Sequence, residues 1–354
     1  MDSALSVDQQ IQKLEEKIVA AKLPPDLLEK INSMLTVLKV SLKSGTGNFI
    51  NFESIANYVN WVASLPFEKE TIDIMDLNAV KVALDKNHYG LLNVKNEILE
   101  YLSALILNMK TSQEKTIRAP IICLVGLVGT GKTTLASSIA ESMGRKFERI
   151  PFGGMGDSLA LRGQSRAFAD AEPGLVIKKL AHSVSKNSVI LLDELDRVSE
   201  AARADIMGVL VELLDPEQNK SFTDHYVDYP FDLSHVLFIA TANNTTNIST
   251  AVLDRLEIIQ MPSYSDDEKI VIAKQYLFPK IKKETGLSQM QLTIDDSLWP
   301  SIIRPLGYDS GIRSLERTME TIARRIARMV VEGKLSENGN FALTEQNIKG
   351  FLPA

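Results

Sequence analysis

Cysteine and histidine are scarce in this chain of 354 residues. Its single cysteine, Cys123, cannot form an internal disulfide, which fits a reducing compartment. The four histidines show no metal-ligand spacing, so the sequence gives no case for zinc. We therefore expect neither a disulfide framework nor a zinc centre to stabilise the fold.

Long apolar runs and an excess of positive charge are missing too. The longest apolar run, APIICLVGLVG (119–129), falls short of the ~18 residues that suggest a membrane span. The start, MDSALSVDQQ, has no charged-then-apolar signal pattern. The net charge of −6 argues against a general polyanion binder, because phosphate contacts need a basic face. We expect a soluble protein.

Three helical patterns open the chain. Residues 9–42 predict two helices, broken at Pro24 and Pro25. The second carries an apolar stripe at helical spacing, formed by Leu27, Leu28, Ile31, Leu35 and Leu38. A loop, SGTGN (44–48), precedes a third helical pattern that stops at Pro66. These helices predict a bundle over residues 1–76, with Trp61 in its core.

Strands and helices alternate over residues 77–262. PIICLVG, SVILLDE and HVLFIATAN read as buried strands, each followed by a helix, and the second of these helices is expected to run to Leu214. This alternation favours a parallel sheet with crossover helices. After Pro262 the strands largely stop, and the pattern predicts a helical subdomain over residues 263–354. One helix there carries an apolar stripe: Ile312, Leu315, Met319, Ile322, Ile326 and Met329. The expected fold class is α/β with all-α flanking domains.

The stretch GLVGTGKT (126–133) fits the phosphate-loop pattern G-x-x-x-x-G-K-[ST] between a strand and a helix. Glycines let backbone N–H groups turn inward around phosphate oxygens at a helix N-terminus. Lys132 would reach the β- and γ-phosphates, and Thr133 would bind Mg²⁺ through its hydroxyl. The predicted phosphate-binding residues are Gly126, Leu127, Val128, Gly129, Thr130, Gly131, Lys132, Thr133 and Thr134.

Two acids end the second predicted strand, VILLDE. Parallel strands present their carboxyl ends to a ligand, so Asp193 can complete the Mg²⁺ shell and Glu194 can deprotonate the attacking water. Ordinary surface acids are the alternative. Asn243, at the end of the third strand, can bond the water or the γ-phosphate, although such an asparagine is more often a turn former. A lone arginine such as Arg255 is usually a surface residue, but it can also serve a neighbouring subunit.

Read together, these residues resemble the ATPase module of the Lon proteases, within the AAA+ superfamily. The resemblance spans most of the chain and is carried by DKNHYGLLNVKNEILEYL (85–102), LDPEQNKSFTDHYVDYPFDLSHVLFIATAN (214–243), LDRLEIIQMPSYSDDEK (253–269) and GYDSGIRSLER (307–317). It implies an AAA+ nucleotide-binding domain over residues 77–262 and a lid over residues 263–354. The same resemblance implies that the N-terminal substrate-recognition region and the Ser–Lys protease domain are absent, so no peptidase activity is expected.

Matched positions imply the remaining roles. Asp193 and Glu194 match the metal-binding and water-activating acids, and Asn243 matches the first sensor of the γ-phosphate. Arg255 matches the arginine finger that enters the next subunit's site, and Arg313 matches the second sensor on the lid. A finger supplied to a neighbour implies a ring, and the family forms hexamers.

Two further segments match family sites. His88 and Tyr89 align with the stretch that frames the adenine, and residues 163–174, GQSRAFADAEPG, align with the pore loop. Phe168 takes the place of the aromatic residue that grips substrate. Core packing is the alternative for Phe168, but its neighbours form no apolar stripe, which favours an exposed loop.

Departures from the family pattern affect the two loops differently. The family phosphate loop GPPGVGKTS reads GLVGTGKTT here, so the fixed positions remain. The family pore loop GHRRTYIG has become GQSRAFAD, with Ala169 and Asp170 after the aromatic residue. We therefore expect intact nucleotide chemistry and an altered translocation surface.

The sequence thus predicts a Mg²⁺-dependent ATPase that binds ATP and ADP, assembles with itself into a hexameric ring, and unfolds and threads protein substrates. The expected location is the bacterial cytoplasm or an organelle matrix, without a membrane or nucleic-acid partner. One alternative is a nucleotide-dependent scaffold with slow hydrolysis. Another is a DNA-handling AAA+ motor, against which the negative net charge argues.

Overall fold

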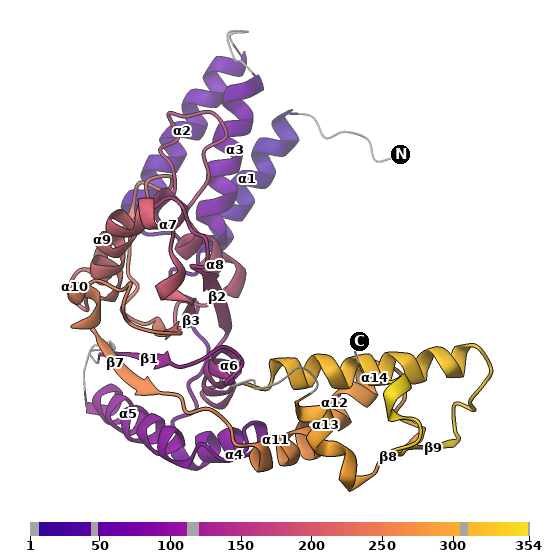
Figure 1. Ribbon diagram of the computed structural model, residues 1–354. Helices are drawn as coiled ribbons and strands as arrows, with labels where there is room; N and C mark the ends of the chain where they lie inside the picture. Colours follow the sequence, from indigo (N-terminus) through magenta and orange to yellow (C-terminus); the bar gives the residue numbers. More distant parts are fainter. Residues whose placement is uncertain (1–6, 44–48, 112–119, 305–310, 353–354) are drawn as a thin grey trace.

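The computed structural model describes residues 7–43, 49–111, 120–304 and 311–352. A helical bundle, a central α/β domain and a C-terminal helical subdomain follow one another along the chain (Figure 1). The predicted fold class is therefore confirmed. Among the described residues, no helix combines the length and the apolar character needed to cross a membrane.

The N-terminal bundle consists of α1 (Val7–Ala21), α2 (Pro25–Lys43) and α3 (Phe49–Ser64). The predicted break at the two prolines is confirmed, because α2 begins at Pro25, where a proline fits the first helical turn. The predicted stripe of α2 is buried except for Leu28, which is half-buried. Trp61 is also half-buried and packs against the core rather than inside it. Residues 44–48, predicted as a loop, lie outside the described residues.

Five parallel strands form the central sheet in the order β2-β3-β6-β1-β7. Their bounds are Ile121–Val125 (β1), Phe147–Pro151 (β2), Val189–Asp193 (β3), Leu237–Ala242 (β6) and Leu256–Gln260 (β7). Every residue of β1, β3 and β6 is buried, as expected for parallel strands covered on both faces. Alternate residues serve different cores: Cys123 packs with the bundle side, and Leu124 packs with the lid side. The three predicted strands are confirmed.

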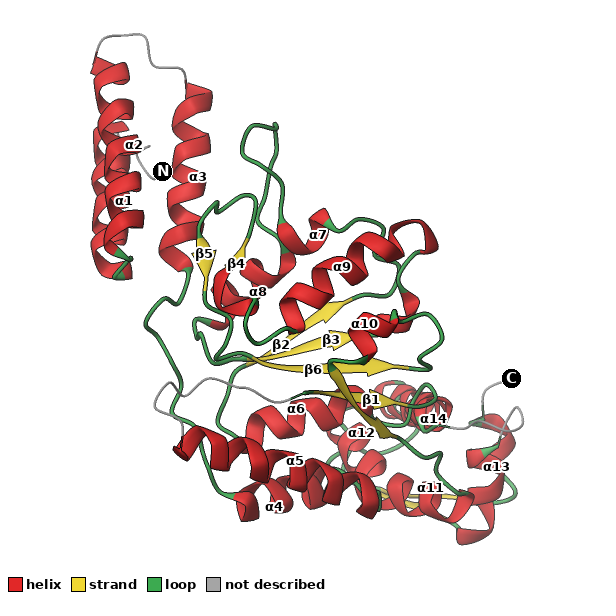
Figure 2. Cartoon of the chain, turned by 90° about the vertical axis from the view of Figure 1, so that its left-hand side faces the viewer, coloured by secondary structure: helices red, strands yellow, loops and turns green. Residues whose placement is uncertain are grey.

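Helices cover both faces of the sheet (Figure 2). On one face lie α4 (Leu77–Asn87), α5 (Leu92–Thr111) and α6 (Lys132–Ser142), and on the other lie α7 (Leu159–Arg162), α8 (Leu175–Ser183), α9 (Arg203–Leu214) and α10 (Thr250–Leu253). The prediction of one long helix to Leu214 is wrong at its start. A left-handed Glu194 turns the chain as β3 ends, and two 3-10 turns precede α9.

The C-terminal subdomain contains α11 (Asp266–Ile272), α12 (Phe278–Glu284), α13 (Trp299–Ile303) and α14 (Arg313–Val331). A π-helical turn, η4 (Ala273–Leu277), joins α11 to α12, where Pro279 lacks an N–H to continue regular α-helical bonding. The expectation that strands largely stop after Pro262 missed a small parallel pair, β8 (Gln291–Ile294) with β9 (Asn340–Leu343). The middle of the predicted α14 stripe is buried.

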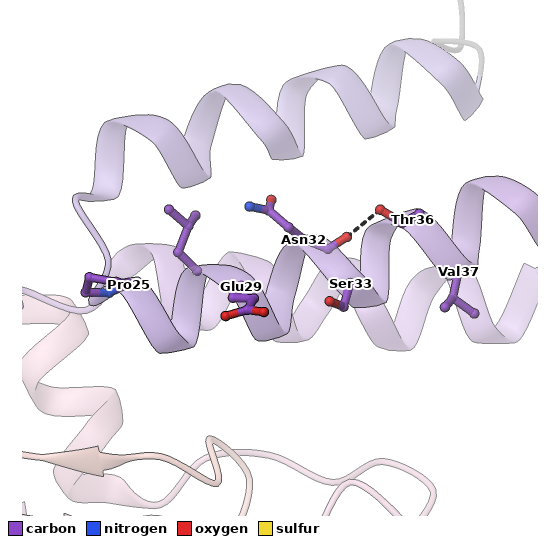
Figure 3. Close-up of a pocket in the computed structure, with 7 residues that line it drawn as sticks. Pro25, Glu29, Asn32, Ser33, Thr36 and Val37 are labelled. Atoms are coloured by element: carbon purple, nitrogen blue, oxygen red, sulfur yellow. Dashed lines mark hydrogen bonds between the residues drawn. The ribbon is translucent and has the colours of Figure 1, made fainter.

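An open groove of about 580 Å³ runs along one face of α2 (Figure 3). The labelled residues are Pro25, Glu29, Asn32, Ser33, Thr36 and Val37. Only one of these side chains is charged, and the bond from Thr36 to the Asn32 carbonyl is internal to the helix. The groove lies on the bundle, away from the phosphate loop, and its lining does not point to a nucleotide.

Candidate functional site

The phosphate loop joins β1 to α6 at the carboxyl edge of the sheet. Gly129 and Gly131 have φ of +82° and +91°, a backbone region that residues other than glycine rarely adopt. A Cβ on Gly126 would lie 2.6 Å from the Met261 carbonyl oxygen, so only glycine fits there. Thr130 is fully buried and donates from its hydroxyl to the Leu127 carbonyl at 2.9 Å. The loop is therefore held in shape by a hydrogen bond within it and by the residue that follows β7.

Lys132 begins α6, and its amine lies at the centre of the loop. The amine donates to the Gly126 and Leu127 carbonyl oxygens at 2.6 and 3.0 Å, and to the Asn243 amide oxygen at 3.3 Å. Burial lowers the pKa of Lys132, while Asp196 and Asp193 act in the opposite direction. The predicted phosphate-binding lysine and the predicted sensor asparagine are thus in direct contact.

Thr133 and Asp193 bring two oxygen donors together. The Thr133 hydroxyl lies 3.5 Å from Asp193 Oδ1. Hydroxyl and carboxylate oxygens suit the oxygen preference of Mg²⁺, so these residues fit the predicted metal. The same carboxylate accepts hydrogen bonds from the Thr241 hydroxyl and, at 2.6 Å, from Arg149 Nε. Asp193 is therefore fixed from three sides.

Glu194 follows Asp193 in a left-handed conformation, with φ of +61°. Such a backbone is strained for a residue with a side chain, and strain of this kind gathers at functional sites. The Glu194 N–H donates to the Thr241 hydroxyl at 2.9 Å. A Cβ on Gly153 would lie 2.8 Å from Glu194 Oε2, so this glycine leaves room for the carboxylate. The acid is turned out of the sheet and stays partly accessible.

Asn243 is held by a residue that the sequence reading missed. Asp196 accepts the Asn243 backbone N–H at 3.0 Å and its side-chain amide at 3.3 Å. These bonds fix the amide so that its oxygen faces Lys132. A second aspartate, two residues after Glu194 in DELD, was the only signal for Asp196 in the sequence.

The C-terminal subdomain touches the phosphate loop directly. The Ile312 N–H donates to the Gly129 carbonyl at 3.0 Å. A Cβ on Gly129 would lie 3.2 Å from Arg313 Cβ, and a Cβ on Gly311 would overlap the Val128 carbonyl oxygen. The N-terminus of α14, and with it Arg313, therefore packs on the loop.

His88 and Tyr89 follow α4 beside the same loop. His88 is buried, and its Nε2 lies 3.1 Å from the Ser138 hydroxyl. Burial, together with the nearby Lys95, lowers the pKa of His88 to about 4, so the ring stays neutral at pH 7. Tyr89 is half-buried. Their place beside α6 fits the predicted adenine side of the site, which remains a prediction.

Models of two known protein families match two parts of the chain. The profile of the "ATPase family associated with various cellular activities (AAA)" matches residues 122–264, and that of the "Lon protease AAA+ ATPase lid domain" matches residues 283–338. The chain carries an AAA ATPase domain and a Lon-type lid. ATP hydrolysis is the activity that this domain indicates.

The chain is also similar to bacterial Lon proteases. The chain is 40% identical to the Lon protease of Lawsonia intracellularis over 356 residues, which cover 99% of this chain and 41% of that protein. It is also 40% identical to Lon protease 1 of Bacillus subtilis over 347 residues, which cover 97% of this chain and 43% of that protein. The chain thus spans about two fifths of the length of the curated relatives that it matches.

Arg255 lies away from the phosphate loop of its own AAA domain. It precedes β7, and its carbonyl accepts the N–H of Ile121, the first residue of β1. The phosphate loop leaves the other end of β1, about 13 Å away at the usual rise per strand residue. The Arg255 guanidinium instead pairs with Asp215 at 3.0 Å. The structure does not bring Arg255 together with the other predicted catalytic residues.

Phe168 is also remote from these residues. It lies on the loop between α7 and α8, and 69% of it is exposed. The prediction of an exposed loop, rather than core packing, is confirmed. Phe168 does not belong to the group of residues that surrounds Lys132.

Three contacts of the AAA domain were missed by the sequence reading, apart from Asp196. Arg149 and Thr241 bond Asp193, and Tyr264 donates to the Thr130 carbonyl at 3.5 Å. Each of these residues is far from its partner in sequence. The pairing of β2 and β6 with β3 brings Arg149 and Thr241 to Asp193, and Tyr264 reaches Thr130 from the connection between β7 and α11.

Proposed function

We propose that this chain is the motor part of a Lon-type assembly, in which Mg²⁺-dependent ATP hydrolysis drives the unfolding and translocation of protein substrates. The observation that carries the proposal is the convergence of Lys132, Asp193, Glu194 and Asn243 around one phosphate loop. Three strands of one parallel sheet deliver these residues to the edge where such sheets bind ligands.

Each converging residue has a role in this proposal. The Lys132 amine exchanges its backbone carbonyl partners for phosphate oxygens, and Asn243 orients the attacking water. Glu194 accepts a proton from that water as it attacks the γ-phosphorus. Thr133 and Asp193 hold Mg²⁺, which neutralises charge on the phosphate oxygens when bound. Arg313, beside Gly129, links the nucleotide to the lid.

A ring completes the proposed site. Arg255 serves the phosphate loop of a neighbouring copy, where its charge stabilises the transferring phosphoryl group. Its position at the opposite end of β1 supports this role, since the side chain cannot span that distance. Six copies in a ring, as the family resemblance implies, give every loop a finger.

Phe168 contacts the polypeptide in this proposal. Its exposed position in the middle of the loop, which leaves the ring free to contact a polypeptide, supports that role. The small Ala169 and the charged Asp170 beside it predict a weaker grip than a bulky aliphatic neighbour gives.

Steady-state ATP turnover tests the proposal. Turnover is measured across a range of chain concentrations, with and without reduced, carboxymethylated lysozyme as an unfolded protein. A steep rise with chain concentration and stimulation by the unfolded protein are expected for a ring that grips polypeptide. Slow turnover that responds to neither contradicts the proposed motor and favours the alternative, a nucleotide-dependent scaffold.

A further inference from the structure

The loop over residues 163–174, called here the Phe168 loop, leaves the AAA domain through a narrow neck. Gly163 has φ of +75°, and a Cβ on it would lie 2.8 Å from the Gly174 nitrogen. A Cβ on Gly174 would overlap the Leu161 carbonyl oxygen. The two ends of the loop are therefore in contact, and no side chain fits between them.

A fully buried carboxylate closes this neck. Asp224 Oδ2 accepts the Gly174 N–H at 2.7 Å, and Oδ1 accepts the N–H groups of Tyr226 and Val227 at 2.8 and 3.0 Å. On the other side of the neck, the backbone N–H that follows Asp224 donates to the Arg162 carbonyl at 2.7 Å. Both ends of the Phe168 loop are thus bonded to one short segment.

That segment, residues 224–229, lies between the short strands β4 (Phe222–Thr223) and β5 (Pro230–Phe231), and we call it the clamp segment. It also bonds the N-terminal bundle, next to the end of α3 (Figure 2). The hydroxyl of Tyr58 donates to the Val227 carbonyl at 3.1 Å, and Tyr58 is fully buried. Lys30 donates to the Asp228 carboxylate at 2.8 Å. The bundle and the loop therefore share one support.

A second contact joins the Phe168 loop to the bundle without the clamp segment. The Arg166 guanidinium lies over the Tyr58 ring, 3.9 Å from its centroid, and also approaches the sulfur of Met34 at 4.0 Å. Arg166 is only two residues from Phe168, whose own side chain stays exposed. The bundle thus touches the loop near its aromatic residue as well as at its neck.

We propose that the clamp segment couples the N-terminal bundle to the Phe168 loop, with Asp224 as the positioning residue that fixes the direction of Phe168. The proposal rests on the function proposed above, in which Phe168 contacts polypeptide. The carboxylate of Asp224 accepts three buried N–H groups, and loss of one acceptor oxygen leaves at least one of them unsatisfied. Because the bundle holds the same segment, its position sets the direction in which the loop projects.

The substitution Asp224→Asn tests this coupling in the whole chain. One oxygen becomes an amide donor that faces a backbone N–H. Asp232→Asn is the matched control, because Asp232 is exposed and its carboxylate accepts the N–H of the nearby Ser234 at 2.9 Å. Hydrogen–deuterium exchange of residues 163–174 and ATP turnover, with and without reduced, carboxymethylated lysozyme, are measured for both variants.

We expect Asp224→Asn to raise exchange in the Phe168 loop about tenfold, as for loss of a buried bond to a charged group. Turnover without the unfolded protein should stay within about twofold, while half-maximal stimulation should need severalfold more unfolded protein. Asp232→Asn should match the wild type in both measurements. Unchanged loop exchange in folded Asp224→Asn would overturn the role of Asp224.

Tyr58→Phe keeps the test decisive if Asp224→Asn does not fold. This variant removes the hydrogen bond from the bundle to the Val227 carbonyl of the clamp segment and keeps an aromatic ring beneath Arg166. We expect faster exchange in the loop and weaker stimulation, and wild-type behaviour in both would contradict the coupling. If the wild-type chain itself is not stimulated by unfolded protein, the proposed function fails. The exchange of the loop then still decides whether the bundle and the clamp segment hold it.

Discussion

The phosphate loop (126–131) and the Phe168 loop (163–174) are both shaped by glycine, but at different places. In the phosphate loop, glycines lie where other parts of the protein press on the chain: Gly126 faces Met261, and Gly129 faces Arg313. In the Phe168 loop, glycines close the neck, and the projecting part carries side chains. One loop is built to present backbone N–H groups, and the other is built to present an aromatic ring.

This difference explains why the two loops tolerate sequence change unequally. Leu127 and Val128, which stand where the family has prolines, are 52% and 39% exposed. Their side chains point away from a cradle that is made of backbone, so their identity matters little to phosphate binding. Ala169 and Asp170 stand beside the exposed Phe168, where side chains form the working surface. Sequence changes in the Phe168 loop therefore alter the surface with which the loop makes contacts.

The largest effect is expected at the phosphate loop, when Arg255 is removed. We expect Arg255→Ala to lower ATP turnover by a factor on the order of 10³, because the neighbouring phosphate loop loses its finger. Turnover at saturating ATP and high chain concentration is the measurement. Mixed rings with a Lys132→Ala subunit, which keeps its own Arg255, should recover activity. Verified mixed rings without recovery would contradict a finger that acts on a neighbour.

A smaller loss is expected when the proposed general base is removed. Glu194→Gln should lower turnover by a factor on the order of 10², because the amide cannot accept the proton of the attacking water. Binding of a fluorescent ATP analogue should be unchanged, since the phosphate loop is untouched. Turnover within about twofold of the wild type would exclude Glu194 as the base.

Much of the phosphate loop and of the helical architecture was predictable from the sequence, since both depend on neighbours along the chain. The spacing from Gly126 to Thr133 defines the loop, and the apolar stripe of α14 defines the buried face of the lid. The acids at the end of β3 were equally visible, because a buried strand delivers its last residues to the ligand edge.

The residues that hold the site were not predictable in the same way. Arg149 reaches Asp193 across 44 positions, and Asp224 reaches Gly174 across 50. Such pairs depend on strand register and on where a hairpin packs, and no local pattern encodes either. The short pair β8–β9 was missed because four-residue strands carry too little periodicity against a helical background.

A comparison of Gly129→Ala with Gly154→Ala separates the effect of contact with the lid from the effect of backbone strain. Gly129→Ala should destabilise the protein by about 1–3 kcal/mol more than Gly154→Ala, because added volume meets Arg313 and Ile312. Gly154 is a matched control: its φ is +78°, close to the +82° of Gly129, but nothing lies within 4 Å of its added Cβ. Denaturant unfolding measures the difference, and equal losses would mean that the packing of α14 on the loop contributes little.

The smallest effect concerns pH and His88. Its pKa falls from 6.5 to about 4 on burial, so between these values the unfolded chain binds a proton that the folded chain does not. Stability should therefore drop as the pH falls from 7 to 5, by about 2 kcal/mol from this residue. His88→Gln should remove that part of the loss. His182→Gln, at an exposed position in the last turn of α8, should retain it. Unfolding free energies at the two pH values decide this.

The hydrogen bond from Ile312 to Gly129 has a thermodynamic consequence for the lid. Any ligand that binds the phosphate loop more tightly in one position of α14 than in another also biases the lid toward that position. Linkage makes this relation reciprocal: a force or a partner that displaces the lid changes nucleotide affinity by the same factor. Through this bond, nucleotide binding can change the position of the lid, and the position of the lid can change nucleotide affinity.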